Sequence, residues 1–155
     1  MKILMVCLGN ICRSPLAEGI LQQKAFDAGL RWSVESAGTI SQTGNSPHYL
    51  SQKIARLHKV DISGQRARRF VKEDMLRFDK IYAMSSDVLQ DITRIAKENQ
   101  NHQKVDLLLN ELYPGLDRSI PDPWSGPEKE YQEVYEMIDA ACSAIVKKYS
   151  LINVQ

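Results

Sequence analysis

The segment from Cys7 to Ser14, with the sequence CLGNICRS, combines residue types that suit an anion-binding loop carrying a nucleophile. Between a strand and a helix, its backbone N–H groups would curl inward at the positive end of the helix dipole. Gly9 and Asn10 tolerate the left-handed backbone angles that such a curl needs. The planar fork of Arg13 matches two oxygens of a tetrahedral oxyanion, and the same field stabilises a Cys7 thiolate. Ser14 can donate a hydrogen bond to that thiolate, so we expect a cysteine nucleophile in a phosphate-binding loop.

A thiolate that attacks phosphorus also needs an acid, because the departing oxygen of a phenol has a pKa of about 10. Asp122 is the candidate, since it lies between Pro121 and Pro123 and is followed by Trp124. Proline fixes its own φ and restricts the residue before it, so this carboxylate is held on a stiff loop. An Asp-Pro pair alone is a common start of a turn, and only its combination with the Cys7 loop favours a general acid.

The surrounding sequence alternates short apolar runs with helical periods, which predicts an α/β fold, a parallel sheet with helices on both faces. The predicted strands are residues 2–7, 32–36, 80–84 and 105–109, and the predicted helices are residues 15–28, 49–59, 72–78, 86–97 and 131–149. Ser14 suits the N-cap of the first helix and Pro15 its first turn. Cys7 then lies where such sheets bind ligands, beyond the carboxyl end of a strand.

The composition is that of one globular domain spanning residues 1–155. The chain has 20 Lys and Arg against 19 Asp and Glu, a net charge of +1, and is 43% hydrophobic. This balance argues against nucleic-acid and membrane partners, and the apolar run at residues 3–8 is too short to span a bilayer. The three cysteines form no CxxC pair and predict neither a disulfide framework nor a zinc site. We therefore expect a cytoplasmic protein that uses no metal and no other cofactor.

Five motifs resemble, in order and spacing, those of the low molecular weight protein tyrosine phosphatases. They are VCLGNICRSPLAE at residues 6–18, ESAGT at 35–39, the single segment at 61–68 that begins with DIS and ends with RAR, AM at 83–84 and PDPW at 121–124. The resemblance covers nearly the whole chain. It implies a three-layer, flavodoxin-like fold with a four-stranded parallel sheet, and metal-free hydrolysis of phosphotyrosine through a phosphocysteine.

The resemblance also implies a role for each matched residue. Cys7 would be the nucleophile, Arg13 the clamp on the phosphoryl oxygens, and Ser14 a support for the thiolate. Asp122 would be the general acid in the first step and the general base in the second. The phosphate would be bound by the loop residues Leu8, Gly9, Asn10, Ile11, Cys12 and Arg13.

Other roles implied by the resemblance concern the surroundings of the loop. Asn10 would hold the loop through a hydrogen bond to Ser36, while Leu8 and Trp124 would flank the phenyl ring. Cys12 would form a reversible disulfide with the nucleophile and protect it from over-oxidation. From its residue type alone, Cys12 fits equally well as a small packing residue of the loop.

Three positions depart from the family pattern. Gln42 stands where many members have an aromatic wall of the pocket, and Tyr49 is the candidate to replace that ring. Gln65 stands where a histidine that supports the phosphate loop is common, and Ser85 stands where an aspartate usually follows the Ala-Met pair. Arg68 matches the arginine that joins this network. We therefore expect altered support of the loop and a retained activity.

A basic cluster lies close to these departures, formed by Arg66, Arg68, Arg69 and Lys72. Two interpretations stay open at this point. The cluster could steer acidic phosphopeptides, or it could be an ordinary solvated face.

Two other functions also stay open. An arsenate reductase would use the same loop, but such enzymes pass a disulfide to further downstream cysteines, and here only Cys142 follows, on the apolar face of the last predicted helix. A non-catalytic phosphate-binding module would explain the three departures, yet it needs neither a thiol nor a positioned acid. We expect a phosphatase that acts on phosphotyrosine-bearing proteins and is a monomer with at most weak self-association.

Overall fold

The computed structural model describes residues 1–97 and 101–154 and contains one sheet of four parallel strands. The strands are β1 (Lys2–Cys7), β2 (Ser33–Gly38), β3 (Lys80–Ala83) and β4 (Val105–Leu107). Their spatial order is β2-β1-β3-β4, so the chain crosses over from one side of β1 to the other. This order confirms the predicted flavodoxin-like α/β fold.

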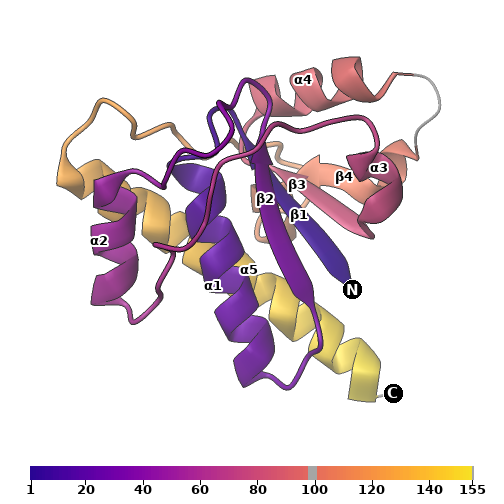
Figure 1. Cartoon of the computed structure of the whole chain (residues 1–155). Coiled ribbons are helices and arrows are strands. Elements are labelled where there is room, and N and C mark those ends of the chain that lie inside the picture. Colours follow the sequence, from indigo (N-terminus) through magenta and orange to yellow (C-terminus); the bar gives the residue numbers. More distant parts are fainter. Residues whose placement is uncertain (98–100, 155) are drawn as a thin grey trace.

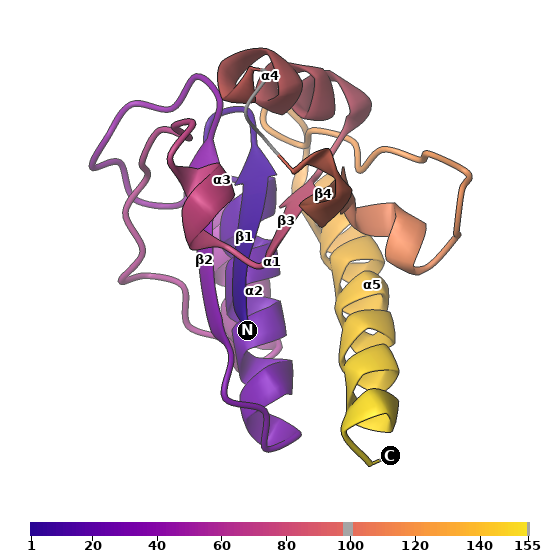
Figure 2. The same cartoon turned by 90° about the vertical axis from the view of Figure 1, so that its right-hand side faces the viewer.

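Helices cover both faces of the sheet (Figure 1, Figure 2). One face packs against α1 (Arg13–Asp27), α2 (Tyr49–Leu57) and α5 (Glu128–Val154), and the other packs against α3 (Asp74–Arg77) and α4 (Ser86–Ala96). Successive strand residues point to opposite faces, so Ile3, Met5 and Cys7 join the first core and Leu4 and Val6 the second. This two-sided burial explains why β1 is continuously apolar. Among the described helices, none is long and apolar enough to cross a membrane.

Two element boundaries differ from the predicted ones in an informative way. Helix α1 begins at Arg13, so its N-cap position falls on Cys12, and the expectation that Ser14 caps this helix is wrong. Ser14 lies inside the first turn, where its hydroxyl faces Cys7. Strand β4 ends two residues early because a 3-10 helix, η2 (Leu108–Glu111), follows and buries two consecutive leucines, Leu108 and Leu109, in the same core.

The loop after β1 lies against the end of β2, where the chain turns away above the sheet (Figure 1). Cys7 pairs with Gly38, and the N–H groups of Thr39 and Ile40 donate to the carbonyls of Cys7 and Leu8 at 3.0 and 2.9 Å. A Cβ at Gly38 would lie 2.7 Å from the Leu8 carbonyl oxygen. Glycine is therefore required here for the two segments to approach each other.

Candidate active site

Cys7 lies at the carboxyl end of β1, with its thiol enclosed by the following loop. The residue is 2% exposed, its Sγ accepts the backbone N–H of Asn10 at 3.2 Å, and Ser14 Oγ is 2.9 Å away. Asn10 has a φ of 58°, in the left-handed region that asparagine tolerates better than most residues. This turn and the N-terminus of α1 together direct N–H groups toward the site of the thiol. The structure thus brings the proposed nucleophile and its supporting serine into contact.

The side chain of Asn10 ties this loop to two other segments. Its Nδ2 donates to Ser14 Oγ at 2.8 Å and to Ser36 Oγ at 3.0 Å, while its Oδ1 accepts the backbone N–H of Arg68 at 3.0 Å. The N–H of Arg68 can only donate, so it determines which end of the amide is the oxygen. Ser14 Oγ accepts from Asn10, and its own proton has two acceptors within reach, Cys7 Sγ at 2.9 Å and the Ala37 carbonyl at 3.5 Å. The shorter contact and the charge of a thiolate favour Ser14 as a donor toward Cys7.

Arg13 and Asp122 face each other at the rim of the loop. Arg13 is 4% exposed, its Nη1 donates to the carbonyl of Ile120 at 3.0 Å, and its Nη2 is 3.7 Å from Asp122 Oδ2. The side chain of Asp122 is 43% exposed, and its Oδ1 accepts the N–H of Trp124 at 3.1 Å. A buried cation and a solvent-accessible carboxylate therefore lie side by side at the entrance to the thiol.

The loop that carries Asp122 is anchored at both ends. Before it, the N–H of Ile120 donates to the carbonyl of Met84, just beyond β3, at 2.8 Å. After it, the hydroxyl of Tyr131 donates to the carbonyl of Trp124 at 3.2 Å. Tyr131 is a fully buried residue of α5, so this anchor belongs to the core. Asp122 is thus presented by a loop that is restricted by its prolines and by these two hydrogen bonds.

A cavity of about 280 Å³ opens above the thiol. Its lining consists of Cys7, Leu8, Gly9, Ile11, Cys12, Arg13, Ile40, Asp122 and Trp124. Leu8 and Trp124 are the two pocket walls expected from the sequence, and Ile40 adds a third apolar wall. Gln42 and Tyr49, which the sequence also placed in the pocket, do not line this cavity. The ring of Tyr49 is 69% exposed and stacks on His48 at 5.0 Å between ring centroids.

Cys12 is a second buried thiol on the wall of the same cavity. It is 4% exposed, and its Sγ is 3.6 Å from the hydroxyl of Tyr131. Burial raises the pKa of Cys12 to about 12, although the hydrogen bond with Tyr131 acts in the opposite direction. Cys12 is therefore a neutral thiol at pH 7, in the immediate surroundings of Cys7.

Glu18 extends the network of Asn10 through Ser36 of β2 back to α1. Its Oε1 accepts the hydroxyl of Ser36 at 2.7 Å, and Ser36 Oγ accepts from Asn10 in turn. Burial raises the pKa of Glu18 to about 7, against the smaller opposite effect of the Ser36 hydrogen bond. A continuous chain of hydrogen bonds therefore connects a carboxyl group that titrates near neutrality with Ser14 and Cys7.

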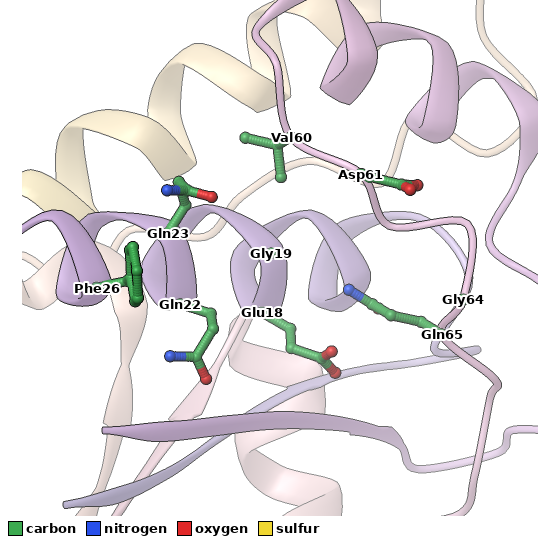
Figure 3. A pocket seen from close by; sticks show the side chains of 9 residues that line it. All are labelled: Glu18, Gly19, Gln22, Gln23, Phe26, Val60, Asp61, Gly64 and Gln65. Carbon is green, nitrogen blue, oxygen red and sulfur yellow. The ribbon is translucent and has the colours of Figure 1, made fainter. Parts of the chain in front are cut away.

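Glu18 also lines a hollow of about 670 Å³ between α1 and the segment 60–65, shown in Figure 3. The carboxylate of Glu18 points toward the side of this hollow where Gln65 lies (Figure 3). Gln65 Nε2 donates to the carbonyl of Pro15 at 3.1 Å, and its buried Oε1 has no partner among the described residues. Gln65 carries no charge and offers Glu18 no compensating cation, which is consistent with the raised pKa of Glu18. The departure from the family pattern at residue 65 thus lies beside the end of the hydrogen-bond chain.

Arg68 and Ser85, the other residues expected to support the loop, have their own partners. The guanidinium of Arg68 binds the fully buried carboxylate of Asp74 through two hydrogen bonds of 3.0 and 3.1 Å. Ser85 Oγ donates to Asp87 Oδ1 at 2.5 Å, which lowers the pKa of Asp87, and the charge of Arg13 lowers it further. Ser85 therefore orients a carboxylate two residues later in the chain, within the electrostatic reach of Arg13.

Ile40 and Glu18 belong to the site but were not identified from the sequence, and only Glu18 had a recognisable sequence signal. Ile40 belongs to a mostly polar loop, and its place in the cavity depends on the bonds that join residues 39 and 40 to β1. Glu18 stands four residues after Ser14, on the same face of α1, and this spacing was a usable signal. Among the described residues, no three His, Cys, Asp or Glu side chains gather in a group that could hold a metal ion.

Comparisons with known proteins agree with this arrangement. A family model described as "Low molecular weight phosphotyrosine protein phosphatase" matches residues 2–151. The protein of that name from Mus musculus is 34% identical over 150 residues, which are 95% of this chain and 94% of the mouse protein. The structure of a protein tyrosine phosphatase from Entamoeba histolytica superposes with a TM-score of 0.88 at 29% identity and covers 96% of both chains. The structure of Vibrio vulnificus Wzb, in complex with benzylphosphonate, has a TM-score of 0.85 at 28% identity and covers 95% of this chain and 97% of that one.

Proposed function

Because the chain belongs to the low molecular weight phosphotyrosine protein phosphatase family, and is therefore a protein tyrosine phosphatase, we propose that it works through a phosphocysteine on Cys7. The observation that carries this mechanism is the convergence of Cys7, Arg13 and Asp122 on one cavity, with Ser14 in contact with the thiol. Each group has the chemistry that one part of the reaction needs.

In the first step, the Cys7 thiolate attacks the phosphorus of phosphotyrosine. The S–P bond forms while the bond between phosphorus and the phenolic oxygen breaks, and Asp122 gives its proton to that oxygen. The loop N–H groups and Arg13 bind the phosphoryl oxygens, where negative charge is spread in the transition state. The products of this step are the free tyrosine side chain and a phosphocysteine.

In the second step, Asp122 takes a proton from a water molecule, which attacks the phosphocysteine. The S–P bond breaks, inorganic phosphate forms, and the electron pair returns to Cys7 Sγ as a thiolate. Ser14, whose oxygen accepts from Asn10, stabilises this leaving thiolate with its hydroxyl proton. Both steps use residues of the chain alone, so the proposed reaction needs no metal or cofactor.

The position of Asp122 beside Arg13 supports its role as the acid and the base of the reaction. Without substrate, the guanidinium of Arg13 lies 3.7 Å from the carboxylate of Asp122. A phosphate bound by Arg13 in the loop would therefore lie next to this carboxylate, within reach for proton transfer to the phenolic oxygen and from the attacking water.

The apolar walls of the cavity support an aryl phosphate as the substrate. Leu8, Ile40 and Trp124 surround the space above the thiol, and Trp124 is 61% exposed at its mouth. A phenyl ring buries apolar surface against such walls and can stack on an indole. We propose phosphotyrosine-bearing proteins as substrates, and we place the enzyme in the cytoplasm as a monomer, a location supported by three free, buried cysteines.

The position of Cys142 weighs against arsenate reduction. The residue is fully buried in α5, and burial raises the pKa of its thiol. It therefore lacks both the access and the thiolate character needed to resolve a disulfide formed at Cys7.

Hydrolysis of para-nitrophenyl phosphate and of a phosphotyrosine peptide, with a metal chelator present, tests the proposed mechanism. We expect turnover by the wild type, none by Cys7→Ser, and a loss of about 10²- to 10⁴-fold in kcat for Asp122→Ala. Cys142→Ala is the matched control for loss of a thiol and should keep its activity. Full activity of Cys7→Ser, or no turnover by a folded wild type, would refute the mechanism.

A further inference from the structure

A basic hollow lies next to the active-site cavity. Its volume is about 470 Å³, and its lining consists of Thr39, Arg69, Phe70, Val71, Lys72, Glu73, Ile95 and Lys97. Three of these side chains are cationic and one is a carboxylate. The hollow therefore combines a positive charge with an apolar floor.

The structure divides the basic cluster seen in the sequence into two pairs. Arg66 and Arg68 are engaged, since Arg66 donates to the carbonyls of Ser63 and Gln65 and Arg68 binds Asp74. Arg69 and Lys72 are exposed and form no ion pair with any described carboxylate. These two cations are thus available to a ligand.

Lys97 joins Arg69 and Lys72 from a distant part of the sequence, the end of α4. The nearby carboxylate of Asp91 is not free to neutralise them. It accepts the hydroxyl of Thr39 at 3.1 Å and is paired with Arg94. Among the described residues that line the basic hollow, Glu73 therefore supplies the one carboxylate against three cations.

The connection to the active site is short. Cys7 pairs with Gly38 in the sheet, and Gly38 forms a bridge with Arg69. Since neighbouring strands are about 4.8 Å apart, the backbone of Arg69 lies about 10 Å from that of Cys7. Consecutive residues of one segment also line the two hollows, since Thr39 lines the basic one and Ile40 lines the active-site cavity.

We propose that this basic hollow binds an acidic side chain of the substrate, about one to three residues from the phosphotyrosine along an extended peptide. The inference rests on the proposed function and adds a substrate class to it, namely phosphotyrosine sites with a neighbouring Asp or Glu. The phosphate enters the loop of Cys7 while the carboxylate meets Arg69 and Lys72. Solvent-exposed ion pairs contribute modestly, so the two cations should raise kcat/KM by about three- to tenfold, and less at high salt.

Two phosphotyrosine peptides that differ only in Asp or Asn at the flanking positions test this inference. We expect the wild type to prefer the Asp peptide, and the double variant R69Q/K72Q to reduce the ratio of the two kcat/KM values toward one. For each variant, kcat/KM for each peptide is divided by kcat/KM for para-nitrophenyl phosphate. This small substrate has no group that could reach the basic hollow, so the division corrects for indirect damage to the catalytic centre. The double variant R31Q/K147Q removes one exposed arginine before β2 and one exposed lysine of α5, neither of which lines the basic hollow or the active-site cavity. It is the charge-matched control and should keep the wild-type ratio.

A binding measurement separates this inference from the proposed function. Fluorescence anisotropy with Cys7→Ser, which holds the peptides without turnover, should show the same preference and its loss in C7S/R69Q/K72Q. A preference that survives the loss of both cations, or no preference in either assay, overturns the inference whether or not the enzyme turns over. Absence of turnover together with a cation-dependent binding preference would contradict only the catalytic mechanism.

Discussion

Replacing Glu18 by glutamine removes the carboxyl group at the outer end of the hydrogen-bond chain that leads to Cys7. The introduced glutamine keeps the shape of the side chain and an oxygen that can accept the Ser36 hydroxyl, so the variant isolates the effect of the charge. The raised pKa of Glu18 shows that the folded protein resists ionisation of this buried group. We therefore expect the substitution to change how the stability of the protein depends on pH.

The direction and size of this change follow from the pKa. A shift from the ordinary value of 4.5 to about 7 corresponds to a ceiling of about 3 kcal/mol, since each pH unit of pKa difference is about 1.36 kcal/mol. The folded state holds its proton more tightly than the unfolded state, so the stabilising contribution is complete below pH 4.5. It is lost as the pH rises through 7. The amide of the variant has no proton to lose in this range and escapes this loss.

Urea denaturation of the wild type and Glu18→Gln at pH 5 and pH 8 measures this effect. We expect the free energy of unfolding of the variant, relative to wild type, to rise between these pH values by up to about 2.5 kcal/mol, because the part of the ceiling lost below pH 5 lies outside the measured range. Asp27→Asn, which changes an exposed carboxylate to an amide at the end of the same helix, is the matched control for the loss of one carboxyl group. An unchanged difference between pH 5 and pH 8 for Glu18→Gln would refute the assignment of a raised pKa to this residue.

Two further predictions concern the surroundings of the thiol. Tyr131→Phe removes the hydroxyl that donates to the carbonyl of Trp124. We expect thermal unfolding to show a loss of about 0.5–1.5 kcal/mol in stability, and we expect a lower kcat because the loop of Asp122 loses one of its anchors. An unaltered kcat would contradict the anchoring role of Tyr131. Peroxide treatment followed by mass spectrometry should show a disulfide between Cys7 and Cys12, and sulfinic or sulfonic Cys7 in Cys12→Ser. Finding only over-oxidised Cys7 in the wild type would reject the protective role of Cys12.

Local sequence was sufficient to predict the continuous apolar strand β1, the residues Gly9 and Asn10 that allow the turn of the loop, and the helix that follows. Each of these depends on residue periodicity or on backbone preference. The role of Ser14 at the helix start was not predictable. The side chain of Ser14 had an N-cap role available locally, but Asn10 and Cys7 offered partners that no local rule includes. Similarly, Arg69 and Lys72 were recognisable as cations, but the sequence did not separate them from Arg66 and Arg68. That separation depended on a local turn that brings Arg66 to the Ser63 and Gln65 carbonyls, and on the carboxylate of Asp74, which only the fold buries beside Arg68.

The sequence by itself determined the chemistry of this protein, because the types and spacing of Cys7, Arg13, Ser14 and Asp122 restrict what reaction they can perform. The tertiary structure decided which residues surround that chemistry. Ile40, Glu18 and Tyr131 reach the site through strand pairing, helix packing and core burial, and these contacts join residues that are far apart along the chain. The physical reason is that a nucleophile's identity is a property of one side chain, whereas a pocket wall, a raised pKa and an anchored loop are properties of a packed environment.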